Sequence, residues 1–155
     1  MQSEGRDRPV CSSCGKTIYV NPVPAAAVVV IRSGDVLITR RAMEPKKGEW
    51  CLPGGFIEWG ESPAEGAARE VLEETNLVVN GLDLIGVYDS ISPLGIQVIV
   101  IAYAAGGWSG EPVPGDDAAE TVWFSLDDVP SLAFSVHERA LADFRARHTV
   151  DTGKP

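Results

Sequence analysis

The chain has 155 residues, of which 45% are hydrophobic, and its formal net charge is −9 at pH 7. This length favours one domain with an ordinary globular core, and the acidic balance disfavours binding to a nucleic-acid polymer. No stretch approaches the roughly 18 apolar residues of a membrane span, and the N-terminal run MQSEGRDRPV lacks the apolar core of a secretion signal. We therefore expect a cytoplasmic protein that is not attached to a membrane.

The N-terminal residues carry a Cys-x-x-Cys knuckle at Cys11 and Cys14. A zinc ribbon needs four ligands, usually from two such knuckles, and only one is present here. Three interpretations stay open: a remnant without metal, which we favour; a zinc site completed by His137, His148 or a second copy of the chain; or a redox pair. The odd cysteine count argues against a disulfide framework, and we expect Cys51 to be buried and to bind no metal.

We divide the chain into an N-terminal tail with the knuckle (residues 1–22), a main domain (23–148) and a C-terminal tail (149–155). The main domain begins with two apolar, β-branched runs that predict buried strands, joined by a turn at Ser33 and Gly34. The expected strands are residues 24–31, 35–40, 78–91 (with a break near Asn80 and Gly81), 95–105 and 119–125, residues 106–115 are an expected loop, and residues 136–147 are an expected closing helix. Such a mixed sheet with helices on its faces is an α/β (α+β) sandwich.

One helix has unusually clear ends. Ser62 can cap it, Pro63 suits its first turn, and Glu65 stands where a capping box requires an acidic side chain. Asn76 tolerates the left-handed backbone that ends many helices. The sequence therefore predicts a helix over residues 63–75.

Carboxylates crowd on this predicted helix. Glu70 and Glu74 share one face, and Glu73 lies one turn from Arg69. Such carboxylates repel one another unless cations neutralise them, and oxygen-only ligand sets suit Mg²⁺ or Mn²⁺. The alternative is a solvated, charged surface helix. We favour a metal site because the pattern does not alternate in sign and because Gly55, in a Gly-Gly loop, precedes it.

The same stretch resembles the Nudix box, whose pattern is Gly, five residues, Glu, seven residues, Arg-Glu, an aliphatic, any residue, Glu-Glu, any residue, Gly and an aliphatic. The matching residues are Gly55, Glu61, Arg69, Glu70, Val71, Glu73, Glu74 and Leu77. Asn76 stands where the family usually has glycine, which touches the helix end and not the carboxylates. The resemblance covers about residues 11–146 and is closest to a subgroup with an N-terminal zinc ribbon. It implies a Nudix-type α/β/α sandwich with a mixed β-sheet.

The resemblance also implies roles for the residues of the box. Glu70 and Glu74 are the expected metal ligands, with the carbonyl of Gly55 as a further one. Glu73 is expected to help hold the metal or to take a proton from the attacking water. Arg69 is expected to orient Glu73 or a second carboxylate, Glu61, and not to touch the substrate.

Further candidates lie outside the helix. Related enzymes often place a metal-binding carboxylate or a carboxylate that acts as base where Glu120 stands, and Asp116 or Asp117 is the alternative for the base. Arg40 and Arg41 are candidates to meet a phosphate, and Glu58 is a candidate to contact substrate. For each of these residues the alternative is a solvated surface position.

Aromatic side chains are candidates to stack on a base. They are Tyr19, Trp50 and Tyr88, and core packing is the alternative that we favour for each.

These features lead us to expect a Mg²⁺-dependent pyrophosphohydrolase that cleaves a nucleoside diphosphate linked to another moiety, with ADP-ribose or FAD favoured. The NADH-hydrolysing group has a Ser-Gln-Pro-Trp-like stretch after the box, to which residues 90–93 are a poor match. The alternatives are a non-catalytic Nudix-like domain that senses a nucleotide or binds a protein, and a zinc-knuckle interaction module. A homodimer that uses the apolar strand at residues 95–105 is a further expectation. The substrate and the general base stay open at this stage.

Overall fold

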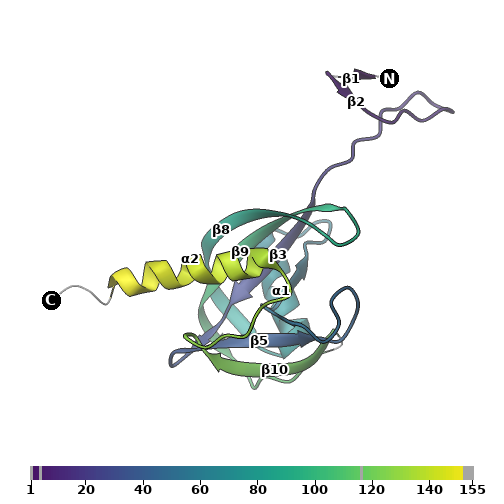
Figure 1. Cartoon of the computed structure of the whole chain (residues 1–155). Coiled ribbons are helices and arrows are strands. Elements are labelled where there is room, and N and C mark those ends of the chain that lie inside the picture. The colour runs from purple at the N-terminus through teal and green to yellow at the C-terminus, as the bar shows by residue number, and fades with distance from the viewer. Residues whose placement is uncertain (1, 4, 116, 152–155) are drawn as a thin grey trace.

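A computed structural model describes residues 2, 3, 5–115 and 117–151, so Asp116 lies outside the described part of the chain. The elements are, in chain order, β1 (Gln2–Ser3), β2 (Arg6–Asp7), β3 (Val23–Val29), β4 (Ile31–Arg32), β5 (Asp35–Arg41), β6 (Trp50–Cys51), β7 (Gly54–Phe56), α1 (Pro63–Thr75), β8 (Val78–Ile91), β9 (Gln97–Ser109), β10 (Ala118–Ser125) and α2 (Ser135–Asp151). Figure 1 shows their arrangement.

Two sheets form the body of the molecule. The central sheet has the strand order β7-β3-β9-β8, and it is mixed because β3 runs parallel to β9 while the other pairs are antiparallel. The second sheet has the order β10-β5-β4, with β6 also paired to β5. The expected turn between the first two long strands is present, with Ser33 and Gly34 both at positive φ.

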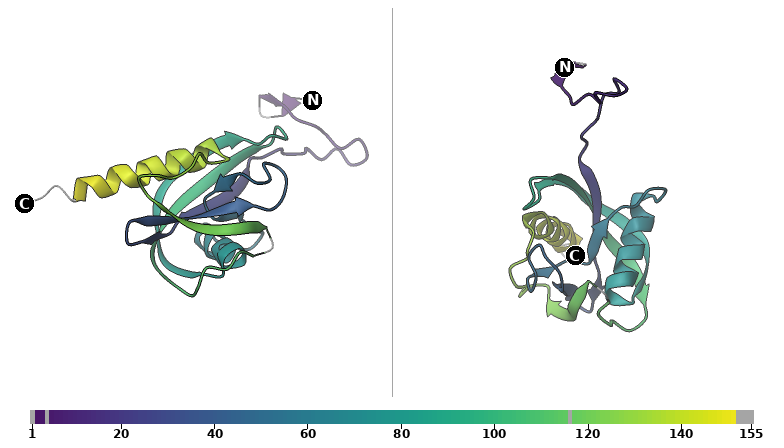
Figure 2. Two further views of the ribbon diagram at one scale, coloured as in Figure 1. Left: turned by 60° about the horizontal axis from the view of Figure 1, so that its bottom comes forward. Right: turned by 90° about the vertical axis from the view of Figure 1, so that its right-hand side faces the viewer.

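The two helices cover opposite faces of the central sheet (Figure 2). On one face, Ala67 and Val71 of α1 pack against Val28 of β3. On the other face, Leu141 and Phe144 of α2 belong to a hydrophobic cluster that is separate from the one with Val28. Fully burying a side chain of this size stabilises the fold by about 1.5–3 kcal/mol. The expected α/β/α sandwich with a mixed sheet is confirmed.

Helix α1 begins and ends as its sequence predicts. The Ser62 hydroxyl accepts a hydrogen bond from the Glu65 N–H, and the Glu65 carboxylate accepts one from the Ser62 N–H. Asn76 has φ 62° and ends the helix in the left-handed conformation. Because these signals lie within a few residues of the helix, no distant contact was needed to predict it.

Strand β8 has the predicted bounds but lacks the predicted break, and β9 extends further toward its C-terminal end than the sequence predicts. The expected break near Asn80 and Gly81 is wrong: Gly81 takes φ 58°, yet the ladder keeps its register past it, and the irregularity lies between Leu84 and Gly86. The expected loop at residues 106–115 is wrong in its first part, because β9 continues to Ser109. Pairing with the start of β8 supplies hydrogen bonds that outweigh the low strand propensity of glycine.

Strand β9 is an inner strand, hydrogen-bonded to β3 on one side and β8 on the other. It therefore has no free edge to offer a second copy, and the homodimer stays a prediction.

Helix α2 begins one residue before the predicted helix and continues through residue 151. None of the helices in the described ranges is long and apolar enough to cross a membrane.

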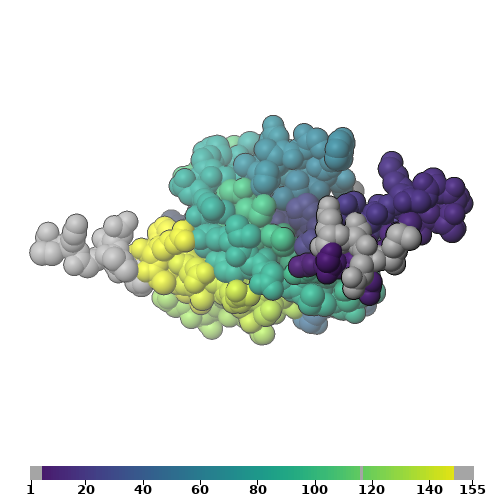
Figure 3. Space-filling view, turned by 90° about the horizontal axis from the view of Figure 1, so that it is seen from above, coloured from purple at the N-terminus to yellow at the C-terminus, as the bar shows by residue number. Residues whose placement is uncertain are grey.

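The N-terminal segment stands out from the rest of the molecule, in purple in Figures 1 and 3. It contains the short β1–β2 pair and, after it, the cysteine knuckle. The Cys11 N–H donates to the Lys16 carbonyl, and the Gly15 N–H donates to the Cys11 carbonyl. The segment reaches the body of the molecule where β3 begins.

Candidate active site

The carboxylates of Glu70 and Glu74 lie against the Gly-Gly segment of β7. The Gly54 N–H donates to Glu74 Oε2 at 3.1 Å, and the Glu74 side chain is buried. A Cβ on Gly55 would stand 2.5 Å from the Glu70 carboxyl carbon, so a residue with a side chain cannot occupy this position without displacing Glu70. The two glycines therefore bring backbone groups of β7 to the carboxylates of α1.

The surroundings of Glu70 and Glu74 disfavour the ionised form of both carboxyl groups. Burial raises the pKa of Glu74 to about 8, and the neighbouring charge of Glu70 raises it further against the one hydrogen bond from Gly54. Burial also raises the pKa of Glu70, although Arg69 opposes the shift. A nearby cation would therefore strongly stabilise the ionised form of both carboxyl groups.

Arg69 is surrounded by acceptors. Its guanidinium makes a two-pronged contact with Glu61 and donates to Glu70 at 2.7 Å, to Glu73 at 3.0 Å and to the Phe56 carbonyl at 2.9 Å. The Arg69 hydrogen bond lowers the pKa of Glu61, and these carboxylates raise the pKa of Arg69. Arg69 therefore fixes the positions of three carboxylates.

The donor set fits a divalent cation of the oxygen-preferring kind. Glu70, Glu74 and the Gly55 backbone lie together, and among the described residues Arg69 is the basic side chain that directly contacts this pair of carboxyl groups. Within the described residues, no group of three or more His, Cys, Asp or Glu side chains is already gathered around a common point. Glu73, the third carboxylate of the cluster, is held by Arg69 and is more than half exposed.

A further carboxylate approaches from the segment before β10. The charge of Asp117 raises the pKa of both Glu70 and Glu74, which places it close enough to act on the cluster. Glu120, the residue favoured from the sequence, is paired with Arg40 at 3.3 Å on an exposed surface. The charge of Asp117 thus acts on both α1 carboxylates, while Glu120 makes an ion pair with Arg40.

A cavity of about 200 Å³ opens beside this cluster, and Gly54 and Gly55 belong to its wall. The other walls come from β3, the segment after β5, residues 90–93, β9 and the first turn of α2. Arg41 also belongs to the wall of this cavity. Its charge acts on Glu74 on one side and on His137 on the other.

Of the two arginines predicted to meet phosphate, only Arg41 lines the cavity. Its Nε donates to the Pro45 carbonyl at 2.7 Å, while Arg40 donates to the Gly48 carbonyl and pairs with Glu120. Adjacent residues of a strand point to opposite faces, which explains the difference.

The other substrate candidates lie apart from the cavity wall. Glu58 is exposed in the loop after β7, where its backbone N–H donates to Glu61. Tyr19 is half exposed on the N-terminal segment, with the Arg8 guanidinium 4.6 Å from its ring centroid. Neither residue is in contact with the carboxylate cluster through a side-chain interaction of the described residues.

The aromatic candidates Trp50 and Tyr88 pack in the core, as we favoured. The Trp50 ring meets Phe124 edge to face at 5.1 Å, and the Tyr88 hydroxyl donates to Asp143 at 2.6 Å. Cys51 is buried beside Thr39, whose hydroxyl lies 3.4 Å from the sulfur, and burial raises the pKa of its thiol.

Sequence reasoning missed most of the cavity. Phe56, Phe134 and His137 line it, and none was predicted to meet substrate. His137 was considered only as a zinc ligand, but it is buried within the main domain, where its Nδ1 accepts a hydrogen bond from the Leu52 N–H at 3.2 Å. The signal was weak because the residues of the cavity wall come from segments far apart in the sequence.

The cysteine knuckle has two free thiols. The backbone N–H groups of Ser13 and Cys14 lower the pKa of the Cys11 thiol. Within the described chain, no histidine or acidic side chain joins the pair to make a group of three ligands. Within the described residues, neither His137 nor His148 completes a zinc site with this pair, and the interpretations as a remnant, a site shared with a second copy or a redox pair stay open.

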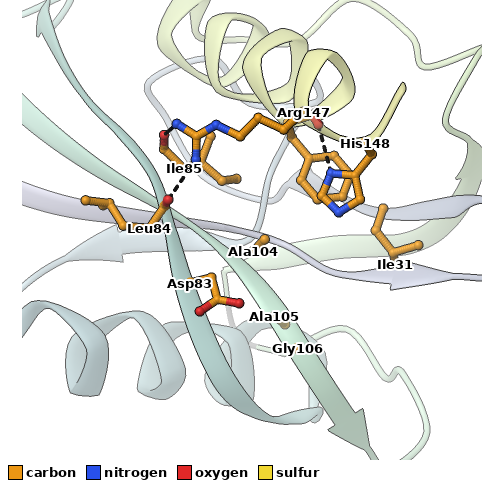
Figure 4. A pocket seen from close by; sticks show the side chains of 10 residues that line it. Ile31, Asp83, Leu84, Ile85, Ala104, Ala105, Gly106, Arg147 and His148 are labelled. Atoms are coloured by element: carbon orange, nitrogen blue, oxygen red, sulfur yellow. Dashed lines mark hydrogen bonds between the residues drawn. The ribbon is translucent and has the colours of Figure 1, made fainter. Parts of the chain in front are cut away.

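A second cavity, of about 410 Å³, lies between the end of α2 and strands β8 and β9 (Figure 4). The Arg147 guanidinium donates to the carbonyls of Leu84 and Ile85, next to the irregularity of β8. The His148 ring pairs with the Phe144 carbonyl at 3.0 Å. The two basic side chains of this cavity, Arg147 and His148, thus interact with backbone carbonyl groups. The α1 carboxylates do not line this cavity.

Comparison with known proteins gives a consistent result. The family model described as NUDIX domain matches residues 21–144. An ADP-ribose pyrophosphatase of Methanocaldococcus jannaschii is 38% identical over 129 residues, which are 82% of this chain and 75% of that protein. The NAD-capped RNA hydrolase NudC of Pseudomonas aeruginosa is 34% identical over 155 residues, covering 97% of this chain but only 51% of that protein.

The solved structures agree with the sequence relatives. A crystal structure of a NUDIX hydrolase from Nitrosomonas europaea has a TM-score of 0.76 and 29% identity, and the match covers 96% of this chain and 82% of that one. A MutT NUDIX hydrolase from Burkholderia pseudomallei has a TM-score of 0.74 and 29% identity, with 79% and 98% covered.

Proposed function

Because the chain belongs to the Nudix family and is a hydrolase acting on phosphoric anhydrides, we propose that it cleaves a nucleoside diphosphate linked to another moiety, with ADP-ribose as the favoured substrate. The observation that carries this proposal is the pairing of Glu70 and Glu74 against Gly54 and Gly55. Such a site attracts a divalent cation and a diphosphate together. FAD remains the second favoured substrate.

Glu70, Glu74 and the Gly55 carbonyl would hold Mg²⁺ or Mn²⁺, the ions that Nudix enzymes generally use. Bound there, the ion would polarise the phosphoryl oxygens and lower the pKa of the attacking water. The chain's own residues provide the other functions. Arg41 faces the substrate with a positive charge that can meet a phosphate oxygen.

The carboxylates outside the metal pair divide the remaining roles. Glu73 is exposed and held by Arg69, which suits a residue that accepts a proton from water or adds to the metal ligands. Asp117 is the second candidate for the base, ahead of Glu120, because its charge reaches Glu70 and Glu74. Arg69 positions Glu61, Glu70 and Glu73 and does not itself take part in the chemistry.

The choice of ADP-ribose rests on the relative from Methanocaldococcus jannaschii, whose name states that activity. A NAD-type substrate is the competitor, because the similarity to the Pseudomonas aeruginosa protein spans 97% of this chain and includes the cysteine knuckle. Since this chain spans about half of that relative, its substrate does not transfer directly.

The test is a substrate panel of ADP-ribose, FAD, NADH, NAD-capped RNA, UDP-sugars and nucleoside triphosphates, each with Mg²⁺ or Mn²⁺ and with product analysis. We expect ADP-ribose to give AMP and ribose 5-phosphate with the highest kcat/KM. The variant Glu74→Gln, run beside the wild type, should lose this activity.

Two results would contradict the proposal. Preferred cleavage of a nucleoside triphosphate would remove the linked-diphosphate substrate class. Binding of ADP-ribose without cleavage of any substrate would favour the alternative of a nucleotide sensor, which keeps the fold without turnover.

A further inference from the structure

The wall of the cavity beside the carboxylates contains a buried polar side chain that the catalytic roles do not use. His137 lines the cavity, is 8% exposed, and comes from the first turn of α2. Its ring contacts Phe134 with centroids 5.2 Å apart. Apart from the bond to Leu52, the ring makes no hydrogen bond to the residues that the structure describes.

The bond to Leu52 determines where the His137 proton is. A backbone N–H can only donate, so Nδ1 must be the acceptor and must be unprotonated. Burial, helped by the charge of Arg41, lowers the pKa of His137 to about 4, so the ring is neutral at neutral pH. The neutral ring then carries its single proton on Nε2, which has no hydrogen-bond acceptor among the residues that the structure describes.

The walls around this donor suit a flat and largely apolar group. Phe56, Phe134 and Ile91 line the cavity, and the hydroxyls of Ser90 and Ser92 are its other side-chain polar groups apart from Arg41 and Cys51. Its volume of about 200 Å³ is below the roughly 300–1,000 Å³ of pockets that enclose a whole ligand. It therefore takes one end of a larger molecule. A sugar, with a hydroxyl on nearly every carbon, would leave most of its polar groups unpaired here.

The position of the cavity indicates which part of the substrate can enter it. Gly54 and Gly55 belong both to its wall and to the surroundings of Glu74 and Glu70. A diphosphate held at those carboxylates therefore directs one end of its molecule into the cavity. Arg41 lines the cavity, and its charge acts on both Glu74 and His137, so it would face a phosphate next to the bound end of the substrate.

We propose that this cavity binds the nucleobase of the substrate and that His137 selects the base by donating a hydrogen bond from Nε2 to a ring nitrogen. The proposal rests on the function proposed above and assigns the base-binding end of the same site. His137 is a specificity-determining residue in this account, and the diphosphate chemistry does not depend on its charge.

Two variants of His137 separate this role from a structural one. In His137→Asn the side-chain oxygen replaces Nδ1 and still accepts from the Leu52 N–H, but nothing donates at the position of Nε2. In His137→Gln the amide nitrogen reaches the position of Nε2 and keeps the donor, while the acceptor for Leu52 is lost. His148→Asn, at the other end of α2, is the control because its ring contacts the Phe144 carbonyl and the Phe144 ring and does not line the cavity beside the carboxylates.

The experiment measures kcat/KM of each protein for ADP-ribose and for three analogues, each with one adenine ring nitrogen replaced by C–H. For the wild type, we expect one analogue to lose on the order of tenfold, the usual cost of an unpaired buried donor. His137→Asn should lose a similar factor with ADP-ribose and lose nothing more with that analogue. His137→Gln and His148→Asn should stay near the wild type with ADP-ribose.

The reverse pattern, with Asn active and Gln impaired, would overturn the proposal in favour of a purely structural His137. Equal cleavage of all analogues by the wild type would also overturn it, and this result needs no variant to fold. Either result leaves diphosphate hydrolysis itself established, whereas failure of the wild type to cleave any substrate in the panel would reject the proposed function.

Discussion

The carboxylate cluster and the cavity beside it are built in opposite ways. The cluster comes almost entirely from one helix and the loop before it, residues 54–74, and its charges are held by local contacts to Arg69. The cavity is assembled from β3, β5, β7, β8, β9 and α2. A short segment therefore carries the chemistry of the diphosphate, while the tertiary fold builds the surface that meets the rest of the substrate.

The largest expected effect tests whether the local cluster carries the chemistry. Glu74→Gln removes a charge and little volume, so it should abolish metal-linked stabilisation worth several kcal/mol and lower kcat by roughly a thousandfold. Steady-state kinetics at saturating Mg²⁺ measures this loss, and circular dichroism checks the fold. Glu58→Gln, in the same loop region but exposed, is the control. A Glu74→Gln variant with wild-type turnover would remove the cluster from the mechanism.

The burial of the Glu74 carboxyl group should also make the free energy of unfolding depend on pH. Its pKa in the folded protein is about 8 against 4.5 ordinarily, so the folded state binds the proton more tightly. The stability it contributes is complete below the ordinary pKa and is lost as the pH rises through about 8. We expect the free energy of unfolding of the metal-free protein to fall by a few kcal/mol between about pH 5 and about pH 9.

Urea denaturation in the presence of a chelator measures this change. Glu74→Gln should show a smaller fall, because glutamine does not titrate. Added Mg²⁺ should restore stability at high pH in the wild type and not in the variant. Identical pH profiles for the two proteins would show that Glu74 is ionised without cost in the metal-free state.

A pair of substitutions compares two candidate bases of the site. Asp117→Asn should lower kcat by about tenfold to a hundredfold, the usual cost of changing a residue that acts on a metal site from outside. Glu120→Gln should have little effect, because it breaks only an exposed ion pair with Arg40. Steady-state kinetics over a range of pH measures both. A larger loss in Glu120→Gln would restore Glu120 as the favoured carboxylate.

A substitution in the cavity wall should change KM for the substrate. Phe56→Ala removes an aromatic wall but leaves the Phe56 carbonyl that Arg69 uses, so KM for ADP-ribose should rise by about tenfold, as expected for a stacking or packing contact of roughly 1 kcal/mol or more. The Mg²⁺ concentration for half-maximal activity should not change. A shift in the Mg²⁺ dependence alone would mean that the two regions are not separate.

The smallest expected effect concerns the helix that holds the cluster. Ser62→Ala removes the side-chain half of the capping box and should lower the free energy of unfolding by about 1 kcal/mol. The kcat should stay close to that of the wild type, because the packing of Ala67 and Val71 still holds the helix. Thermal unfolding combined with kinetics would detect either result, and a large loss of kcat would show that the cluster needs the full rigidity of the cap.

The sequence by itself determined the helix over residues 63–75, the carboxylates on it, and the membership of the family, because capping, helical spacing and the box are local patterns. It also indicated the sandwich and the positions of its main strands along the chain, while the order of the strands in the sheets came from the structure. Only the tertiary structure decided that β8 and β9 pair past their glycines, that the charge of Asp117 acts on Glu74, and that Glu120 pairs with Arg40. It also decided that His137 closes a cavity with Phe56 and Phe134. These features depend on contacts between distant segments, and the periodicity of a single segment carries no information about its partners.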